Sequence, residues 1–358
     1  MKKPKLSPKL KLKNPIKRRL GAEARVTEAF ANVPRITNDT VAEHREEVLA
    51  GARKFIYPLQ HSKHRVVRTS AILLVTALIA FFSYVGLALY RFQSTSTFLY
   101  DVTRVIPLPV AKAGSKWVSY ESYLFELKRN MHYYHTQQHI DFSAPNGKPQ
   151  LARLKTQAMN SVIQAAYVKE LAAPKGIHVT DQEVHDQVAL VRSQNRLGSN
   201  DRVFKDVLNE FWGWSVTDFE RELRQQLLQQ KVASTLDTVS LDRANSVLKQ
   251  VQGGADFAAL ATANSDDAAT KTNGGQYPNP ILRSDHAVPP QLAAAFFSLK
   301  ANETSGLITS GYTREIIKVI DTNGSSVHAA HIQFNIKDID SRIKPLAAKQ
   351  PSHQYIKI

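Results

Sequence analysis

The sequence predicts an α+β protein with one transmembrane helix, a mainly helical domain, and a domain in which helices flank a small antiparallel sheet. Three observations support this fold class. Residues 71–90 carry no charged side chain, residues 151–232 repeat apolar side chains at helical spacing, and residues 253–336 combine helix signals, glycine turns and strand-like alternation. A chain of 358 residues is long enough for two or three domains.

The uncharged segment from Ala71 to Tyr90 is long enough to cross a bilayer, because about twenty helical residues span about 30 Å. Its uniform apolarity argues against the core helix of a soluble protein. A cleaved signal peptide would have a shorter apolar region much closer to the N-terminus. We therefore expect a transmembrane helix, with Tyr84 and Tyr90 as anchors at a membrane interface.

Charge is distributed unevenly on the two sides of this segment. Residues 1–70 carry a net charge of +11 and the remainder of the chain carries +5. Lys63, Arg65 and Arg68 stand directly before the span. The positive-inside rule then places residues 1–70 in the cytoplasm and residues 91–358 outside, so the expected location is a cell membrane crossed once.

Residues 1–20 are basic and interrupted by proline, so we expect a disordered tail. Each Lys or Arg near an anionic membrane contributes about 1 kcal/mol of binding. Nucleic acid competes as a partner for such charge, but tethering at the membrane and the lack of interleaved aromatic residues favour lipid. A capping box at Thr40-x-x-Glu43 predicts a helix through Phe55. That helix either lies along the inner membrane surface or is a plain linker.

After the membrane span we expect a linker over residues 91–109. The segment Phe98–Ala113 has an extended pattern that includes Pro107 and Pro109. Residues 110–119 predict two short strands joined by a turn, after which Ser119 caps a helix.

Further amphipathic helices predict a helical domain over residues 110–238. Their signals are, in order, Leu151 to Ala166, the capping box Thr180-x-x-Glu183, the stripe Phe204, Val207 and Leu208 before Trp212-Gly213-Trp214, and the capping box Thr217-x-x-Glu220. The aromatic residues of this domain are expected to pack in its core. The alternative is that some of them line an apolar surface that binds unfolded chains; the residues concerned are Trp117, Tyr120, Trp212 and Trp214.

Two stretches of this domain are similar to the N-terminal chaperone domain of SurA-like and PrsA-like foldases. They are Gly176-Ile177-His178-Val179-Thr180-Asp181-Gln182-Glu183-Val184, and the segment from Phe219 through Leu223-Arg224-Gln225-Gln226-Leu227-Leu228 to Lys231-Val232. The resemblance covers roughly residues 110–236. It implies an extracytoplasmic domain that binds unfolded or exported polypeptides.

The stretch from Gly253 to Val319 carries an ordered set of short motifs. They are Gly253-Gly254-Ala255-Asp256-Phe257, Leu260-Ala261, Ser265-Asp266-Asp267, Gly274-Gly275, Ala295-Phe296-Phe297-Ser298-Leu299, Gly311-Tyr312 and Ile316-Ile317-Lys318. In this order and spacing they resemble a parvulin-type peptidyl-prolyl isomerase domain. The resemblance implies isomerisation of X-Pro bonds by a domain over residues 239–340, with residues 341–358 left as a C-terminal tail.

Parvulins usually begin with a strand reading H-I-L-V, and no such strand precedes Asp256 here. A similar strand follows instead, because residues 321–324 (Asp-Thr-Asn-Gly) predict a hairpin and residues 327–336 alternate in polarity. Alternation places His331 and Gln333 on the same face of this strand. In parvulins the first and last strands are central neighbours, so we expect a circularly permuted sheet. The alternative is a truncated second repeat, for which only residues 331–358 remain.

The parvulin active site matches this chain only in part. The family pairs two histidines beside an apolar wall that holds the proline ring. The expected set is, for catalysis, His331 as the first histidine with Thr313 or Glu315 in place of the second, and, for substrate binding, Val288, Leu292, Phe297 and Gln333. The alternative for His331 is a structural histidine of the strand.

Prolyl isomerisation faces a barrier of about 18–20 kcal/mol and requires no nucleophile, metal or cofactor. An apolar pocket that binds the twisted amide better than the planar one lowers that barrier. The chain has no phosphate-binding loop, no H-E-x-x-H motif and no cysteine, so we expect no cofactor and no metal.

Three functions remain open. The first is a membrane-anchored foldase that isomerises X-Pro bonds. The second is a non-catalytic chaperone or assembly scaffold that keeps the parvulin fold for binding. The third is a structural envelope protein whose basic tail binds a cytoplasmic partner.

Overall fold

The computed structural model describes residues 37–56, 59–193, 200–285 and 288–358. The chain divides into two units, residues 1–82 and residues 83–358. The expectation of a disordered tail over residues 1–20 lies outside the described residues.

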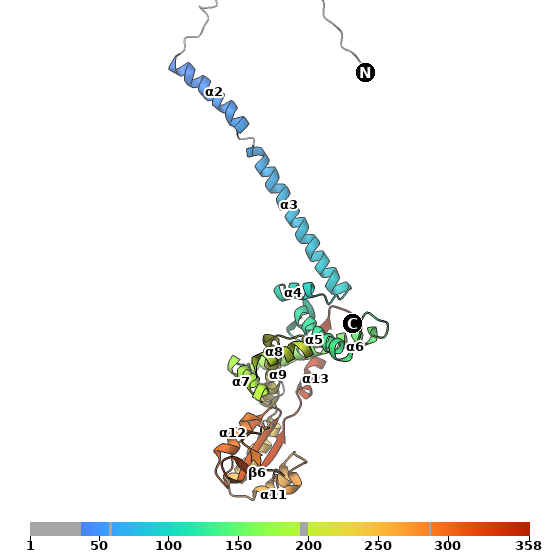
Figure 1. Cartoon of the computed structure of the whole chain (residues 1–358), viewed down its shortest axis with the longest axis vertical. Helices are drawn as coiled ribbons and strands as arrows, with labels where there is room; N and C mark the ends of the chain where they lie inside the picture. Colours follow the sequence, from blue (N-terminus) through green and yellow to red (C-terminus); the bar gives the residue numbers. More distant parts are fainter. Residues whose placement is uncertain (1–36, 57–58, 194–199, 286–287) are drawn as a thin grey trace, which may run out of the picture. The chain divides into compact units, whose positions relative to one another are not determined.

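The first unit contains the helix α2, Asn38–Ile56, and most of the helix α3, Leu59–Gly86 (Figure 1). The predicted helix through Phe55 is therefore confirmed, but its capping box is wrong by one turn. The Thr37 hydroxyl accepts a hydrogen bond from the Thr40 N–H at 3.3 Å, so Thr37 stands at the N-cap position. Thr40 lies inside the first turn, where its own N–H needs a partner.

Within the described part of the chain, α3 and the π-helical turn η2, Leu87–Arg91, make the one stretch long and apolar enough to cross a membrane. It spans His64–Arg91 and contains the predicted segment. Large aliphatic side chains along it are exposed, including Ile72, Leu73 and Ile79. Exposure of many such side chains is unfavourable in water, whereas it is the normal condition of a helix in lipid.

In the second unit, the end of this stretch packs against the residues that follow it. Val85 and Leu89 are buried. The Tyr90 hydroxyl donates a hydrogen bond to the Pro109 carbonyl at 2.6 Å, and the Tyr120 hydroxyl donates to the Leu89 carbonyl at 2.6 Å. The last residues of the stretch, from Val85 to Tyr90, therefore pack within the second unit.

The expectation of an extended segment from Phe98 is wrong, because Thr97–Val105 form the helix α4. The Ser96 hydroxyl caps this helix by accepting a hydrogen bond from the Leu99 N–H at 3.3 Å. Leu99 and Thr103 lie one turn apart and are both buried. Packing of this face stabilises the helix, which ends at Val105, before Pro107 and Pro109.

The helical part of the second unit contains two short strands and five long helices that follow them. Their bounds are β1 Pro109–Ala113, β2 Lys116–Ser119, α5 Tyr120–Gln138, α6 Lys148–Ala172, α7 Asp181–Ser193, α8 Asp201–Trp212 and α9 Val216–Leu236. A 3-10 turn, η3 Ala173–Lys175, ends α6. The predicted strand–turn–strand and the Ser119 cap are confirmed, since the Ser119 hydroxyl accepts from the Ser122 N–H at 3.1 Å.

One predicted capping box is confirmed and one is shifted. Thr180 and Glu183 exchange the expected hydrogen bonds at the start of α7. At the start of α9, however, the box is formed by Ser215 and Asp218, not by residues 217 and 220. Gly213 ends α8 in the left-handed conformation with φ +66°, and α9 begins only three residues later.

The aromatic residues of the helical part divide into core and surface. Trp214 is buried and stacks on Phe125 with ring centroids 5.5 Å apart, and Tyr120 is fully buried. Core packing is therefore confirmed for these two. Trp117 is 63% exposed on β2, so the expectation of core packing is wrong for this residue.

The sheet-containing part follows α9 and is built from four strands and flanking helices. Its elements are α10 Thr238–Gln252, α11 Phe257–Asn264, the 3-10 turn η4 Lys271–Asn273, β3 Ile281–Leu282, α12 Pro290–Ser298, β4 Ile308–Ser310, β5 Thr313–Thr322 and β6 Ser326–Asn335. The strand order is β3-β6-β5-β4, with each neighbouring pair antiparallel. The predicted hairpin of β5 and β6 is confirmed, and these are the two central strands, as a permuted sheet requires.

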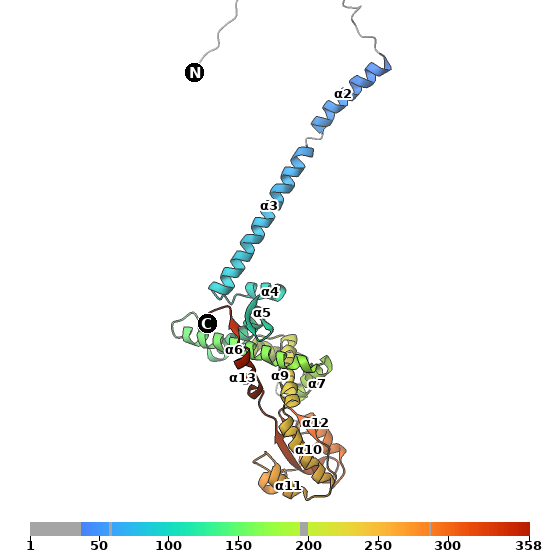
Figure 2. The ribbon, with the colours of Figure 1, turned by 180° about the vertical axis from the view of Figure 1, so that it is seen from behind.

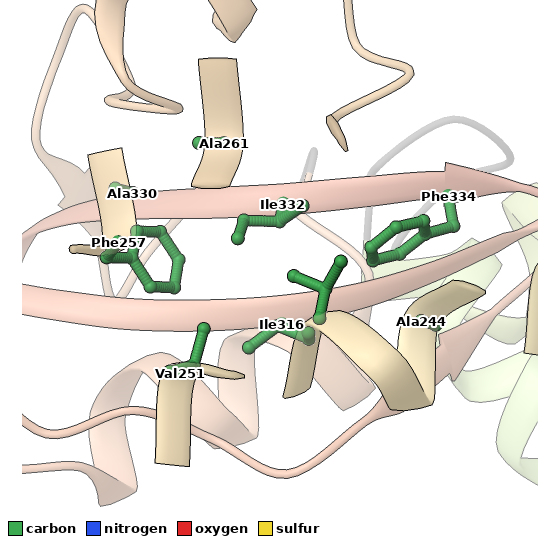
Figure 3. Close-up of a cluster of buried hydrophobic side chains, with 9 residues drawn as sticks. Ala244, Val251, Phe257, Ala261, Ile316, Ala330, Ile332 and Phe334 are labelled. Carbon is green, nitrogen blue, oxygen red and sulfur yellow. The ribbon is translucent and has the colours of Figure 1, made fainter. Parts of the chain in front are cut away.

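Alternation along β5 and β6 gives the sheet two apolar faces. One face includes Ile316, Ile332 and Phe334 and packs against α10 and α11, with Phe257 of α11 in the same cluster (Figure 3). The other includes Ile317, Val319 and Ala329 and packs against Leu292 and Phe296 of α12. His331 and Glu315 have odd numbers, so they lie on the α12 face.

Residues 341–358, expected as a tail, belong to two ordered elements. The helix α13, Asp340–Lys349, packs against α6, and the strand β7, His353–Gln354, pairs antiparallel with β1. The Tyr167 hydroxyl donates to the Gln350 carbonyl at 2.6 Å. Both views place the C-terminus beside α6 (Figures 1 and 2). The chain thus returns from the sheet to complete a second sheet of order β2-β1-β7.

Candidate functional site

The central strands bring His331 and Glu315 together on the α12 face. In the β5–β6 register, Ile317 is opposite His331 and Glu315 is opposite Gln333, so His331 and Glu315 are diagonal neighbours. The Glu315 Oε2 lies 2.9 Å from the His331 Nδ1. Both residues are buried, with 4% of each exposed. Of the two residues that the sequence offered in place of a second histidine, Glu315 is therefore the one that contacts His331.

His331 has hydrogen-bonding partners at both ring nitrogens. On the Nδ1 side these are Glu315 and the Tyr277 hydroxyl, each at 2.9 Å. On the Nε2 side they are the Asp267 carboxylate and the Thr270 hydroxyl, each also at 2.9 Å. With a carboxylate at each nitrogen, the ring is suited to be the imidazolium that donates to both.

Electrostatics favour that charged ring. Burial alone would lower the pKa of His331, but hydrogen bonds to Glu315 and Asp267, together with their charges, outweigh burial and raise the pKa above the ordinary 6.5. Burial would raise the pKa of Asp267, but hydrogen bonds from Thr270, from the Ala269 N–H and from His331 lower it below 3.8. Burial, with the nearby carboxylates, raises the pKa of Tyr277, which stays a neutral phenol.

The segment Ser265–Asp267 positions Asp267 by pairing with β6. The Asp266 N–H donates to the Gln333 carbonyl at 2.7 Å, and the Gln333 N–H donates to the Ser265 hydroxyl at 3.1 Å. The Asp266 carboxylate accepts from the Asn335 N–H at 2.9 Å. The motif Ser265-Asp266-Asp267 thus follows the end of α11, bonds to β6, and places the Asp267 carboxylate next to His331.

The glycine pair bonds to the same edge of β6 as this segment, two residues earlier in the strand. The His331 N–H donates to the Gly275 carbonyl at 2.8 Å. Gly275 has φ +80°, and a Cβ built on it would lie 2.2 Å from the His331 carbonyl oxygen. Only glycine allows the two backbones to approach this closely, so the predicted use of Gly274-Gly275 as a special turn is confirmed. Tyr277 follows directly and covers the ring of His331, with ring centroids 4.5 Å apart.

Thr313 acts on Glu315 and not on His331. Its hydroxyl lies 3.0 Å from both the Glu315 Oε1 and the Ser310 carbonyl oxygen, so its one proton is donated to either acceptor or shared between them. The two alternatives from the sequence are therefore both part of one chain of hydrogen bonds, in which Glu315 is adjacent to the histidine and Thr313 is one step away.

The predicted substrate-binding residues lie in different surroundings. Leu292 is buried on the α12 face, in an apolar cluster against which Val288 and Tyr277 pack. The Phe297 ring packs against the same cluster and also lies under the Arg283 guanidinium at 4.3 Å. The Gln333 side chain donates to Asn335 at 2.8 Å. Val288, Leu292 and Phe297 thus share a cluster with the ring that covers His331, whereas Gln333 makes another contact.

Three residues of the His331 network were not predicted as site residues: Asp267, Thr270 and Tyr277. Asp267 belongs to the motif Ser265-Asp266-Asp267, and that motif is the one feature of the sequence that could have indicated it as a site residue. As the structure stands, both ring nitrogens of His331 are engaged and Tyr277 covers the ring, so the network orders the strand and closes the site. No three His, Asp or Glu side chains are arranged to hold a metal ion within the described ranges.

Comparison with known proteins matches both parts of the chain. Residues 60–233 match the model of the SurA-like N-terminal domain, and residues 227–321 match that of the PPIC-type PPIase domain. The second match ends before β6 begins, as expected for a strand that the family places at the other end of the domain.

Curated relatives carry names of the same two kinds, a PPIase on one side and a foldase or chaperone on the other. A parvulin-like PPIase from Rickettsia bellii is 34% identical over 130 residues, covering 36% of this chain and 42% of that protein. The foldase protein PrsA from Caldanaerobacter subterraneus is 27% identical over 185 residues, covering 48% and 58%. The chaperone SurA from Pectobacterium atrosepticum is 25% identical over 238 residues, covering 51% and 53%. The chain spans about half the length of these relatives.

Proposed function

Because it joins a SurA-like N-terminal domain to a PPIC-type PPIase domain, the chain is a SurA/PrsA-like foldase, and we propose that it holds unfolded exported polypeptides at the outer surface of a membrane. The observation that carries this proposal is the combination of a matched chaperone domain with a closed His331 site. Holding an unfolded polypeptide requires the chaperone domain and does not require the His331 site to open.

The proposed anchor is the stretch His64–Arg91. Its length, its exposed aliphatic side chains and the basic residues before it support a single span with the N-terminus in the cytoplasm. Lipid is the proposed partner of this span and of the basic tail. We keep residues 110–238 as the proposed chaperone domain and 239–340 as the proposed parvulin-like domain, with α13 and β7 returning to the former.

The absence of cysteine allows a sharp test of the topology. Single substitutions Ser7→Cys and Ser325→Cys place one thiol on each side of the span. In intact cells a membrane-impermeant maleimide should label Ser325→Cys and should label Ser7→Cys only after the membrane is permeabilised. Labelling in the opposite pattern would overturn the orientation, and labelling of both before permeabilisation would overturn the span.

Isomerisation of X-Pro bonds is the second candidate function. It is supported by the match to the PPIC-type PPIase domain and by the buried arrangement of His331, Asp267 and Glu315, in which His331 is the proposed counterpart of the first parvulin histidine. In this candidate the Tyr277 ring must move away from His331, and Val288 and Leu292 then contact the proline ring. Glu315 and Asp267 keep the imidazole fixed while the amide rotates, and preferential binding of the twisted amide supplies the acceleration.

The two candidates are distinguished with the full-length chain in detergent. We measure suppression of aggregation of a chemically unfolded client and, in parallel, cis-to-trans conversion of a short X-Pro peptide. Wild type is compared with His331→Ala, Leu292→Ala and Tyr277→Phe. The holding function predicts suppression of aggregation that the three variants retain. Peptide conversion that falls in the first two variants would establish the isomerase, and failure to suppress aggregation would refute holding.

A further inference from the structure

A cavity of about 340 Å³ lies in the helical part of the second unit, away from the His331 network. Its walls are β2, α6 and α9. Apolar side chains of α6 and α9 form part of the lining, including Val162, Ala166 and Leu228. The exposed ring of Trp117 also lines it. The cavity therefore offers both buried aliphatic contacts and an aromatic surface that solvent reaches.

The cavity follows the free edge of a sheet. All four residues of β2, Lys116–Ser119, line it. In the order β2-β1-β7, β2 is an edge strand, and within the described residues no strand pairs with its other side. An edge strand presents backbone donors and acceptors to which an extended peptide adds as a further strand. An edge beside an apolar cavity is thus suited to an extended polypeptide.

The charges of the lining have one sign. It contains the cations Lys116, Lys169, Arg221 and Arg224 and no Asp or Glu. Arg221 is neutralised by a two-point ion pair with Glu121, and Arg224 is paired with Asp181. The two lysines have no ion pair in the described part of the chain. The carboxylate that interacts with Lys169 is that of Glu121, which is already paired with Arg221, so the lining keeps a net positive charge that matches an anionic group on an entering peptide.

We propose that this cavity binds an extended polypeptide segment along the edge of β2, and that Lys116 and Lys169 select a segment in which an acidic side chain adjoins apolar ones. This inference rests on the proposed holding function and names the class of polypeptide held and the place that holds it. The apolar lining takes the aliphatic side chains, the β2 edge pairs with the peptide backbone, and the lysines bind the carboxylate.

The test uses the full-length chain in detergent and short peptides blocked at both ends, so that every carboxylate is a side chain. The reference peptide alternates valine and threonine around one central glutamate and carries a fluorophore for polarisation. Its partner has glutamine in place of glutamate. We expect the glutamate peptide to bind about tenfold more tightly, the size typical of a hydrogen bond to a charged group. Methylating alternate backbone amides of the glutamate peptide should abolish binding.

Matched variants assign the preference to the cavity. Lys169→Glu should remove or reverse the preference for glutamate over glutamine. Lys175→Glu makes the same charge change at an exposed lysine that does not line the cavity, and it should leave the preference intact. Equal binding of the two peptides, or loss of preference in both variants, would overturn the proposal.

Suppression of client aggregation is measured on the same samples. Suppression without any preference between the peptides would overturn the carboxylate selection and leave the holding function standing. Absence of both would overturn the two together.

Discussion

The substitution Gly275→Ala directly tests whether close backbone contact positions His331. Gly275 has φ +80°, and an added Cβ would lie 2.2 Å from the His331 carbonyl oxygen and 3.0 Å from the Ala261 Cβ. A left-handed backbone costs a side-chain-bearing residue about 1–2 kcal/mol. Relieving the clash separates the two backbones and sacrifices the 2.8 Å hydrogen bond from the His331 N–H, worth about 1 kcal/mol. The expected loss of stability is therefore about 2–3 kcal/mol, or about 30–150-fold.

Hydrogen–deuterium exchange of β6 measures this loss in the domain concerned. Protection of residues 327–335 should fall by that factor in Gly275→Ala. Gly306→Ala is the matched control, because no atom lies within 4 Å of its built Cβ, and its protection should change by less than about threefold. Undiminished protection of β6 in Gly275→Ala would refute the argument that close backbone contact positions His331.

Three further predictions follow from contacts in the second unit. Raising the pH from about 6 to about 9 should lower the protection of β6 in wild type more than in His331→Gln, as measured by hydrogen exchange corrected for intrinsic rates. The pKa of His331 is raised in the folded state, so the stability that its charge contributes is fully present below the ordinary pKa of about 6.5. That stability is lost as the pH rises through the raised folded-state pKa. Arg314→Leu removes the guanidinium donor from the part-buried carbonyl of residue 234 and from the buried carbonyl of residue 237, which keeps the Ser240 hydroxyl at 3.4 Å. This should cost about 2–5 kcal/mol in denaturant unfolding, against less than about 0.5 kcal/mol for Arg202→Leu, whose side chain is 92% exposed. Ser215→Ala should cost about 1 kcal/mol, measured by circular dichroism during denaturation, and Thr217→Ala less than half of that, because Ser215 caps α9.

Local signals were sufficient to predict much of the fold. Asp256 caps α11 by accepting from the Ala259 N–H at 2.7 Å, as its position before Phe257 indicated. The Asn-Gly pair at 323–324 predicted the hairpin, and period-two alternation then placed His331 on the correct face of β6. These predictions depend on neighbours within a few residues, where spacing alone determines geometry.

The remaining features depend on contacts between distant residues. Tyr277 reaches His331 only after β6 has taken its place in the sheet, so nothing near Tyr277 in the sequence indicates the contact. Helix α4 is stabilised by burial of Leu99 and Thr103, which is a property of the assembled unit. Trp117 has the character of a core residue, yet it lies on an exposed edge strand. The spacing of residues in a sequence does not show which side chains stay exposed in the folded unit.

The pairing of β1 with β7 has a consequence for the order in which the chain folds during synthesis. On the edge of β1 away from β2, Ala111 and Lys112 pair with residues 354 and 353, so this sheet cannot be completed until those residues have left the ribosome. The sheet of β3 to β6 lies wholly between these two strands, and it can form while β1 still waits for β7. Its folding then shortens the loop that joins the waiting ends, and the entropy cost of closing that loop falls. The sheet of β3 to β6 thus prepares the closure of the sheet whose strands flank it in the sequence.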